Sequence, residues 1–334
     1  MGAPRAAFDG TPQGAIPAAG PELVEGPSRG VSGMGVLAGL GAGAFWGSTF
    51  IAPLVVPEFG SVDLTVGRYL ACGLLSLVLL LWAALRGQRR WPSAQQAWSA
   101  LLLSVLGYTG YYLLLVLAIQ AAGAALPVLI IGTIPLWIML LGKPQGLRWR
   151  ALLPGLLLTG AGIALMLQAS AHGAEGAAVR GSGSRLWLGF LLALLAAASW
   201  TAFGLLNARW LARHPEVNST LWANWLGVAA GLGALGIAAV AGSSPAQLVA
   251  MPRFPLFVLV CLVTGIGAAW VASVLWNMAS RRLSPSLAGQ LIVSETVFGL
   301  LYAFVWSGQW PLPAQWAAGA LFVLGILASI RAHR

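Results

Sequence analysis

The chain has 334 residues, of which 59% are hydrophobic and only 8% are charged, and its mean hydropathy is +0.84. Soluble proteins carry about 25% charged residues. This composition therefore excludes an ordinary soluble domain and predicts a polytopic membrane protein.

Apolar runs of about 20 residues, enough to cross about 30 Å of hydrocarbon, recur along the whole chain. They cover residues 34–55, 64–85, 97–119, 122–141, 150–168, 186–208, 219–241, 256–279, 285–306 and 314–331. We therefore expect an all-α integral membrane protein with ten transmembrane helices. Residues 1–33 are rich in Pro, Gly and Ala and contain no continuous apolar run, which predicts a disordered cytoplasmic tail rather than a signal peptide.

Two stretches of the first half recur in the second half. The sequence GAFWGSTF at 43–50 resembles AASWTAFG at 197–204. The longer sequence AAGAALPVLIIGTIPLWIML at 121–140 aligns with RLSPSLAGQLIVSETVFGLL at 282–301. These matches indicate an internal repeat.

The repeat divides the chain into a first five-helix unit at 34–168 and a second at 186–331, joined by a Gly- and Ser-rich loop at 169–185. Because five is an odd number, the second unit enters the membrane from the opposite face. Inverted repeats of this kind are typical of secondary transporters that use alternating access.

The cations are unevenly distributed between the loops. If the N-terminus is cytoplasmic, 14 of the 18 Lys and Arg residues lie on the cytoplasmic side and 4 on the other side. The positive-inside rule then predicts that both termini are cytoplasmic, in the cytoplasmic (inner) membrane. The net charge of +10 is explained in this way without a nucleic-acid partner.

Three elements resemble the drug/metabolite transporter superfamily, EamA type. They are FWGS at 45–48, Arg68-Tyr69, and the fourth span together with its counterpart in the ninth. The resemblance implies a ten-helix transporter of small organic metabolites, with export of amino acids or related metabolites as the leading function. Members commonly carry Glu-Pro within the fourth and ninth spans, where this chain has Ile134-Pro135 and Glu295-Thr296.

One acid, Glu295, lies inside the apolar run LIVSETVFGLLYAF at 291–304. A charge at the bilayer centre costs about 2.5–3.5 kcal/mol on insertion scales, so such residues usually have a function. Ten residues from Pro285 place Glu295 about 15 Å deep, near the midplane. We interpret it as a group that anchors substrate or couples transport to protons. The alternative is a protonated carboxyl that only donates a hydrogen bond to a neighbouring helix.

Aromatic and polar side chains recur at helical spacing on several spans, as expected for the walls of a small-ligand pocket. The candidate substrate-binding residues are Trp46, Thr49, Tyr108, Tyr112, Trp200, Asn207, Trp270, Ser273, Asn277, Glu295 and Tyr302. Arg68 is a second candidate coupling residue, although a side chain one turn below the surface can also snorkel to it. For the Trp and Tyr residues the alternative is a lipid-facing belt at the membrane interface.

Enzyme chemistry has no visible basis in the sequence. The three histidines, His172, His214 and His333, lie in loops or the tail without partners at metal-ligand or nucleophile–base spacing. We therefore expect no metal and no cofactor, and a small-molecule substrate. The alternatives are an importer or exchanger of a nucleobase-like or cationic aromatic compound, and, in another class, a passive channel or scaffold. The oligomeric state stays open, a monomer included.

Overall fold

The structure, a computed structural model, describes residues 33–87, 91–141, 149–172, 183–283, 285–308 and 310–331. These residues belong to one compact unit, and every regular element among them is a helix. The predicted tail lies outside the described residues except for Gly33, and the centre of the predicted connecting loop also lies outside them.

The helices of the first half follow the first five predicted spans. They are α1 (Gly33–Gly47), η1 (Ser48–Phe50), α2 (Ala52–Val55), α3 (Ser61–Leu85), α4 (Ala94–Ser104), η2 (Val105–Thr109), α5 (Gly110–Ala122), α6 (Ala125–Ile131), α7 (Ile134–Leu141) and α8 (Trp149–His172). A capping box between Ser93 and Gln96 sets the start of α4.

The second half contains the counterparts of these helices and one short surface helix, α12. Its elements are α10 (Gly183–Arg213), α11 (Ser219–Ala241), α12 (Pro245–Ala250), α13 (Phe254–Leu262), η3 (Val263–Val271), α14 (Ala272–Arg282), α15 (Pro285–Ser307) and α16 (Pro313–Arg331). Helices α8 and α10 extend to His172 and Gly183, so they include residues that the sequence places in the connecting loop.

Five helical stretches among the described residues are long and apolar enough to cross a membrane. They are Ser61–Leu85, Ala94–Ala122, Ser184–Arg213, Thr220–Ala241 and Phe254–Trp276. Shorter apolar helical stretches, the first of them divided between α6 and α7, occupy Ala125–Ile138, Leu153–Met166, Val293–Ser307 and Pro313–Ala328. The all-α membrane fold is therefore confirmed, whereas the number of ten spans stays a prediction.

The predicted fourth span is interrupted. The sequence suggests one helix over 122–141, but α6 ends at Ile131 and α7 starts at Ile134. Pro135 explains the break, because it has no N–H to donate and restricts the backbone of the residue before it. The Thr133 hydroxyl donates to the carbonyl of Ile130 at 2.6 Å and so satisfies one carbonyl at the break.

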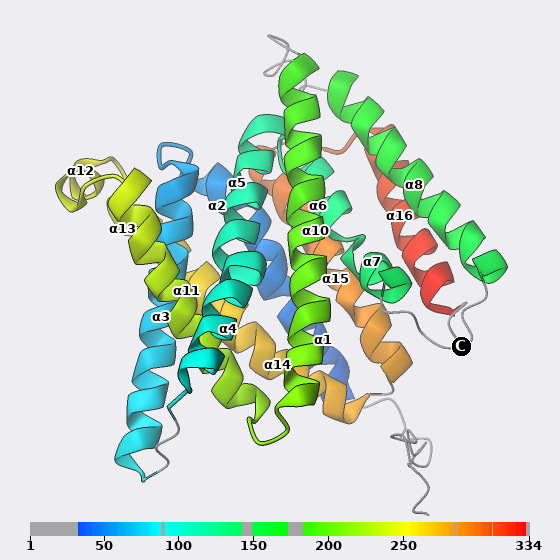
Figure 1. Ribbon diagram of the computed structural model, residues 1–334. Coiled ribbons are helices and arrows are strands. Elements are labelled where there is room, and N and C mark those ends of the chain that lie inside the picture. The colour runs from blue at the N-terminus through cyan, green and yellow to red at the C-terminus, as the bar shows by residue number, and fades with distance from the viewer. Residues whose placement is uncertain are drawn as a thin grey trace, which may run out of the picture. The chain divides into compact units, whose positions relative to one another are not determined.

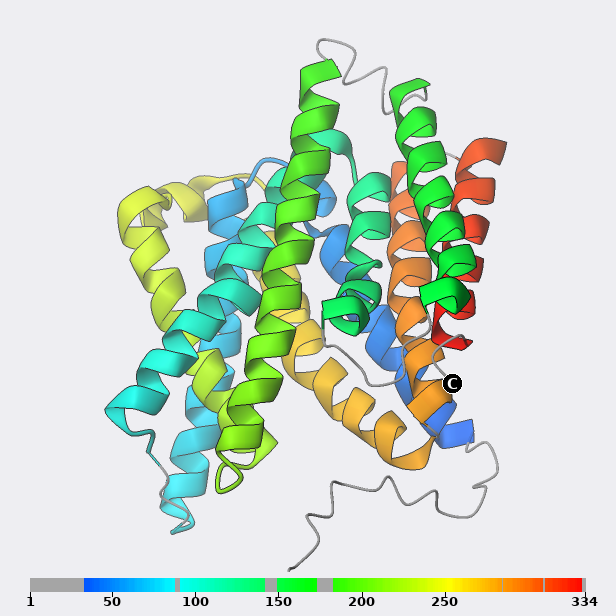
Figure 2. The ribbon, with the colours of Figure 1, turned by 45° about the vertical axis from the view of Figure 1, so that its right-hand side comes forward.

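Helices of one half pack against helices of the other in equivalent pairs. Helix α8 packs along α16, as Figures 1 and 2 show, and α3 packs along α11. The contact of α5 with α10 corresponds to the contact of α14 with α1. Likewise, the contact of α1 with α15 corresponds to the contact of α10 with α6 and α7. Both repeats also contain a π-helical segment, η2 in the third span and η3 in the eighth. This equivalence agrees with the repeat read from the sequence.

Glycines bring α1 and α15 into backbone contact. A Cβ atom added at Gly47 would lie 2.9 Å from the Gly299 nitrogen and 3.2 Å from the Glu295 carbonyl oxygen. One added at Gly43 would lie 3.1 Å from the Glu295 nitrogen. Small residues at four-residue spacing permit such close approach between membrane helices. The backbone of Glu295 is therefore held directly against α1.

Candidate functional site

Glu295 lies near the middle of α15, and its side chain is partly exposed. Among the described residues, no group forms a hydrogen bond or an ion pair with its carboxylate. Its charge acts at longer range on Tyr111 of α5 and on Arg68 of α3. Glu295 is thus a partly exposed acid near the middle of an apolar helix.

Arg68 is buried, with 7% of its surface exposed, so it does not snorkel to the protein surface. Its Cζ atom lies 4.1 Å from the centre of the Tyr112 ring and 5.4 Å from that of Tyr69. The Nε and Nη1 atoms of Arg68 have no hydrogen-bond partner among the described residues, and neither has the hydroxyl of Tyr112. Two adjacent side chains therefore carry three buried, unpartnered polar atoms.

An unpartnered buried donor costs about 1–3 kcal/mol, and more when it is charged. Cation–π contacts such as those of Arg68 contribute about 0.5–2 kcal/mol. The contacts with Tyr69 and Tyr112 therefore offset only part of the cost of burying this guanidinium.

An aromatic cluster connects Arg68 to α10. The Tyr69 ring lies 5.8 Å from that of Tyr108, and the Tyr108 ring lies 5.8 Å from that of Phe203. Tyr111 and Trp200 contact each other with ring centres 4.8 Å apart. Three predicted site residues, Tyr108, Tyr112 and Trp200, are therefore in one cluster.

The cluster has a buried side and an accessible side. Tyr69 and Tyr112 are each about 1% exposed, whereas Tyr108, Trp200 and Glu295 are partly exposed. The buried groups of the cluster thus combine tyrosines with one cation, and its partly exposed groups are aromatic rings. The acid Glu295 acts on this cluster only at longer range. This arrangement suits a small organic molecule that carries both apolar and charged groups.

The π-helical segment η2 shapes this region. Tyr108 lies within η2, and the Ser199 hydroxyl of α10 donates to the carbonyl of Leu106 at 2.7 Å. π-helical turns are rare, and those that occur within α-helices are frequently at functional sites. Ser199 and η2 together fix α10 against the third span where the tyrosines gather.

Three further candidates lie outside this cluster. Trp46 pairs with Trp276 at 5.6 Å between ring centres, and the Thr49 hydroxyl donates to the Trp46 carbonyl within its own helical turn. The Asn207 side chain accepts a hydrogen bond from the Trp222 indole at 2.6 Å. Asn207 therefore links α10 to α11 rather than lying beside Arg68.

The remaining candidates are exposed or partly exposed, or have a side chain that the structure does not describe. Trp270 is 38% exposed and has no ring contact with a described aromatic residue, and the Ser273 hydroxyl donates to the carbonyl of Ala269. Tyr302 pairs with Phe298 near the end of α15. The side chain of Asn277 is outside the part of the chain that the structure describes. None of these assignments is tested by the geometry, and they stay predictions.

Tyr69 is in the cluster although the sequence did not identify it as a site residue. It directly follows Arg68, and its ring contacts both the guanidinium and Tyr112. Adjacent residues on a helix point about 100° apart, so periodicity alone assigns Tyr69 to another face. The position of Tyr69 directly after Arg68 was the sequence feature that could have identified it.

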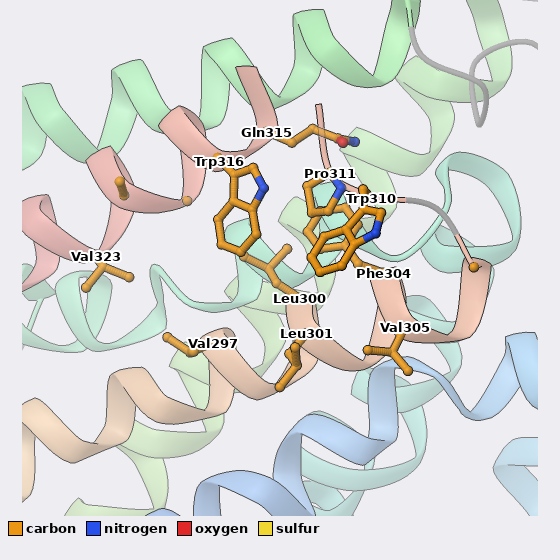
Figure 3. Close-up of a pocket in the computed structure, with 13 residues that line it drawn as sticks. Val297, Leu300, Leu301, Phe304, Val305, Trp310, Pro311, Gln315, Trp316 and Val323 are labelled. Carbon is orange, nitrogen blue, oxygen red and sulfur yellow. The ribbon is translucent and has the colours of Figure 1, made fainter. Parts of the chain in front are cut away.

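A groove of about 620 Å³ between α15 and α16 is separate from this cluster. Figure 3 shows Trp316, Trp310 and Phe304 around it. Its lining is apolar except for Gln315, whose Oε1 accepts a hydrogen bond from the Leu312 nitrogen at 2.8 Å. None of the predicted substrate-binding residues lines this groove. Its composition suits hydrocarbon rather than a charged metabolite.

Comparison with known proteins identifies the architecture. The model of the EamA-like transporter family matches residues 33–168 and again residues 187–331. The chain belongs to the EamA-like transporter family. The two matches fall on the two predicted repeats and confirm the resemblance to this family. Membership makes the chain a multi-pass membrane transporter of small molecules.

One curated relative supports this assignment, and one solved structure shares the fold. "Inner membrane protein YtfF" from Escherichia coli (strain K12) is 33% identical over 321 residues, which cover 89% of this chain and 95% of that protein. A solved crystal structure of another protein, 20% identical, has a TM-score of 0.61 over 90% of this chain and 98% of the other. At this identity the second match shows the fold alone.

Proposed function

We propose that this transporter is a secondary transporter of the inner membrane that works by alternating access and exports amino acids or related metabolites. The observation that carries the proposal is Glu295, a partly exposed acid without a partner among the described residues, near the middle of a membrane helix. Such acids typically mark substrate or proton pathways. The name of the Escherichia coli relative, an inner membrane protein, supports the localisation.

Proton coupling follows from competition at one carboxylate. A substrate ammonium group binds the charged form of Glu295, and a proton binds the same group. If the inverted repeats expose the site to one side of the membrane at a time, the two ligands exchange in opposite directions. Proton entry then drives substrate exit.

The test is a flux measurement with purified protein in liposomes. We expect saturable, ATP-independent flux of an amino acid that responds to a pH gradient. Glu295→Gln should abolish the response to the gradient or the flux itself while the protein stays folded. Glu58→Gln, which removes an acid outside the membrane helices, is the matched control and should transport like the wild type. Unchanged flux and pH response in Glu295→Gln would show that the acid is only structural.

A nucleobase-like or cationic aromatic substrate is the second candidate. The rings of Tyr108, Tyr111 and Trp200 favour it, because aromatic faces stack on planar ligands and attract cations. Flux of adenine or a quaternary aromatic amine, with none for any amino acid, would select this alternative.

The orientation of the termini is part of the proposal. The excess of cations in alternate loops supports cytoplasmic ends for both. Single cysteines placed at either end of a variant without Cys72 and Cys261 should resist impermeant thiol reagents in intact cells. Ready labelling at either end would reverse the topology.

A further inference from the structure

The feature that the proposed function leaves unexplained is the unsatisfied guanidinium of Arg68. It is buried among Tyr69 and Tyr112, and two of its nitrogen atoms have no partner among the described residues. Membrane proteins rarely bury a cation without an anion, because hydrocarbon cannot replace the lost hydration. We therefore expect a negatively charged group to neutralise the Arg68 guanidinium at some stage of the transport cycle.

The described part of the chain does not supply that group. The carboxylate of Glu58 pairs with Arg253, beside α2 and at the start of α13. Asp63, in the first turn of α3, accepts two hydrogen bonds from Ser243 instead, at 2.9 and 2.8 Å. Glu295 influences Arg68 only through space. The guanidinium thus has an aromatic environment and no carboxylate.

The available donors define the chemistry of the missing partner. A guanidinium presents several N–H donors in a plane, a geometry that matches carboxylate and phosphate oxygens. The hydroxyl of Tyr112 adds one more unpartnered donor beside it. A ligand with two or three acceptor oxygens and a negative charge would satisfy these atoms, whereas a cation or a hydrocarbon would satisfy none.

We propose that Arg68, with the Tyr112 hydroxyl, is an oxyanion receptor that binds the carboxylate or phosphate group of the transported solute. This inference rests on the proposed function, since it takes the aromatic cluster to be the solute site. Arg68 and Glu295 then have separate roles. Arg68 binds the anionic end of the solute, and Glu295 stays available to a proton or to a cationic end.

The test compares ligands with and without the negative charge. Thermal unfolding of the purified full-length protein is measured with each of the common amino acids, with the carboxamide of each, and with inorganic phosphate. We expect at least one free acid or phosphate to stabilise the protein. Amidation of a binding acid should weaken its binding about 10- to 100-fold, as for the loss of a charged hydrogen-bonded contact.

Variants of Arg68 assign the effect to this residue. Arg68→Gln should lose the preference for acid over amide, and Arg68→Lys should retain part of it because the charge remains without the planar fork. Arg86→Gln is the matched control, because Arg86 also lies over an aromatic ring, with its Cζ 3.8 Å from the centre of the Trp82 ring, but is exposed at the end of α3. It should bind like the wild type.

The outcomes separate the receptor from the transport proposal. Equal stabilisation by acids and their amides, or none by any acid or by phosphate, overturns the receptor even if liposome flux is observed. Stabilisation by phosphate alone that is lost in Arg68→Gln retains the receptor and identifies its ligand as a phosphate, whereas phosphate stabilisation that persists in this variant reflects general exclusion of the salt and overturns the receptor. Arg68-dependent binding of an oxyanion without any flux retains the receptor and overturns transport. The comparison of acid with amide in the wild type does not depend on whether the Arg68 variants fold.

Discussion

The fourth and ninth spans occupy equivalent places in the two repeats but differ in backbone structure. In the first repeat the span is broken between α6 and α7, with Pro135 just after the break. In the second repeat α15 continues from Pro285 to Ser307, and the aligned positions carry Glu295 and Thr296. One repeat thus keeps the helix-breaking proline and the other keeps the acid.

The two spans meet where they differ. A side chain at Gly132, at the break, would collide with the Thr296 hydroxyl and with the ring of Phe322. The continuous helix places Glu295 one residue from this contact, while the backbone contact with α1 fixes the same turn from another side. This difference indicates that the two copies of a duplicated span can have different structural roles. A rigid helix positions the acid, and a broken one supplies a discontinuity beside it.

The largest effect on the free energy of unfolding is expected from introducing a proline into α15 at the position that aligns with Pro135. Thr296→Pro removes a helical hydrogen bond and places the proline ring against the preceding turn, which costs about 3 kcal/mol or more in a helix interior. Pro135→Ala should change the free energy of unfolding by less than about 1 kcal/mol, because the chain is already broken there. Chemical or thermal unfolding in detergent measures both. Equal losses in the two variants would contradict the distinction between the spans.

A smaller effect is expected at the glycines that face the two spans. Gly47→Ala would place a methyl group 2.9 Å from the Gly299 backbone nitrogen, which forces α1 and α15 apart at about 1–3 kcal/mol. Gly204→Ala, on α10, would meet only the end of the flexible Ile138 side chain of α7, at 3.0 Å. We expect Gly204→Ala to be nearly neutral in the same unfolding measurement. A loss at Gly204 as large as at Gly47 would show that α7 is packed as tightly as α15.

The Thr133 hydroxyl at the break should contribute less to the free energy of unfolding than the close packing at Gly47. The Thr133 hydroxyl donates to the Ile130 carbonyl and accepts a hydrogen bond from the Trp137 indole at 3.0 Å. Thr133→Val keeps the shape and removes both bonds, for an expected loss of about 1 kcal/mol because Trp137 is partly exposed and regains a partner elsewhere. Thr133→Ser keeps the hydroxyl and should recover most of this loss. If serine and valine are equally destabilising, the methyl group of Thr133 is responsible instead of its hydroxyl.

The smallest effect concerns a link between repeats that involves neither span. The Arg253 side chain donates to Glu58 at 2.8 Å, and this hydrogen bond lowers the pKa of the Glu58 carboxyl below its usual value. Since the folded-state pKa is the lower one, the stabilisation is present at neutral pH. It is lost as the pH falls through the usual carboxyl range and then through the lowered folded value. The side chain of Glu58 is 21% exposed and that of Arg253 is 48% exposed, so solvent and salt screen the effect.

The unfolding temperatures of the wild type and Glu58→Gln should therefore differ slightly at neutral pH and converge in acid. Arg253→Gln should reproduce this pattern, since it removes the other partner of the pair. A difference between wild type and Glu58→Gln that grows as the solution is acidified would contradict the sign of the pKa shift.

The structure brings together three of the residues that the sequence predicts for the substrate site. Tyr108, Tyr112 and Trp200 were identified from aromatic spacing on single helices, and they contact neighbours in one cluster. Asn207 was identified in the same way and instead binds Trp222. Spacing on one helix gives the relative angle of two side chains, but not which neighbouring helix that face meets. Pairings between helices therefore could not be predicted from these patterns.

By itself, the sequence determined the membrane class and the two repeats, because hydrophobic length and internal similarity are properties of a chain taken alone. The depth of Glu295 near the midplane, which follows from the helical rise, stays a prediction. Pro135 also marked the place of the break, although its effect on the predicted helix over 122–141 was missed. Only the tertiary structure decided that Arg68 lies over Tyr112 without an acidic partner among the described residues. Burial and pairing depend on side chains that arrive from other helices, and these contacts leave no local signal in the residues that make them.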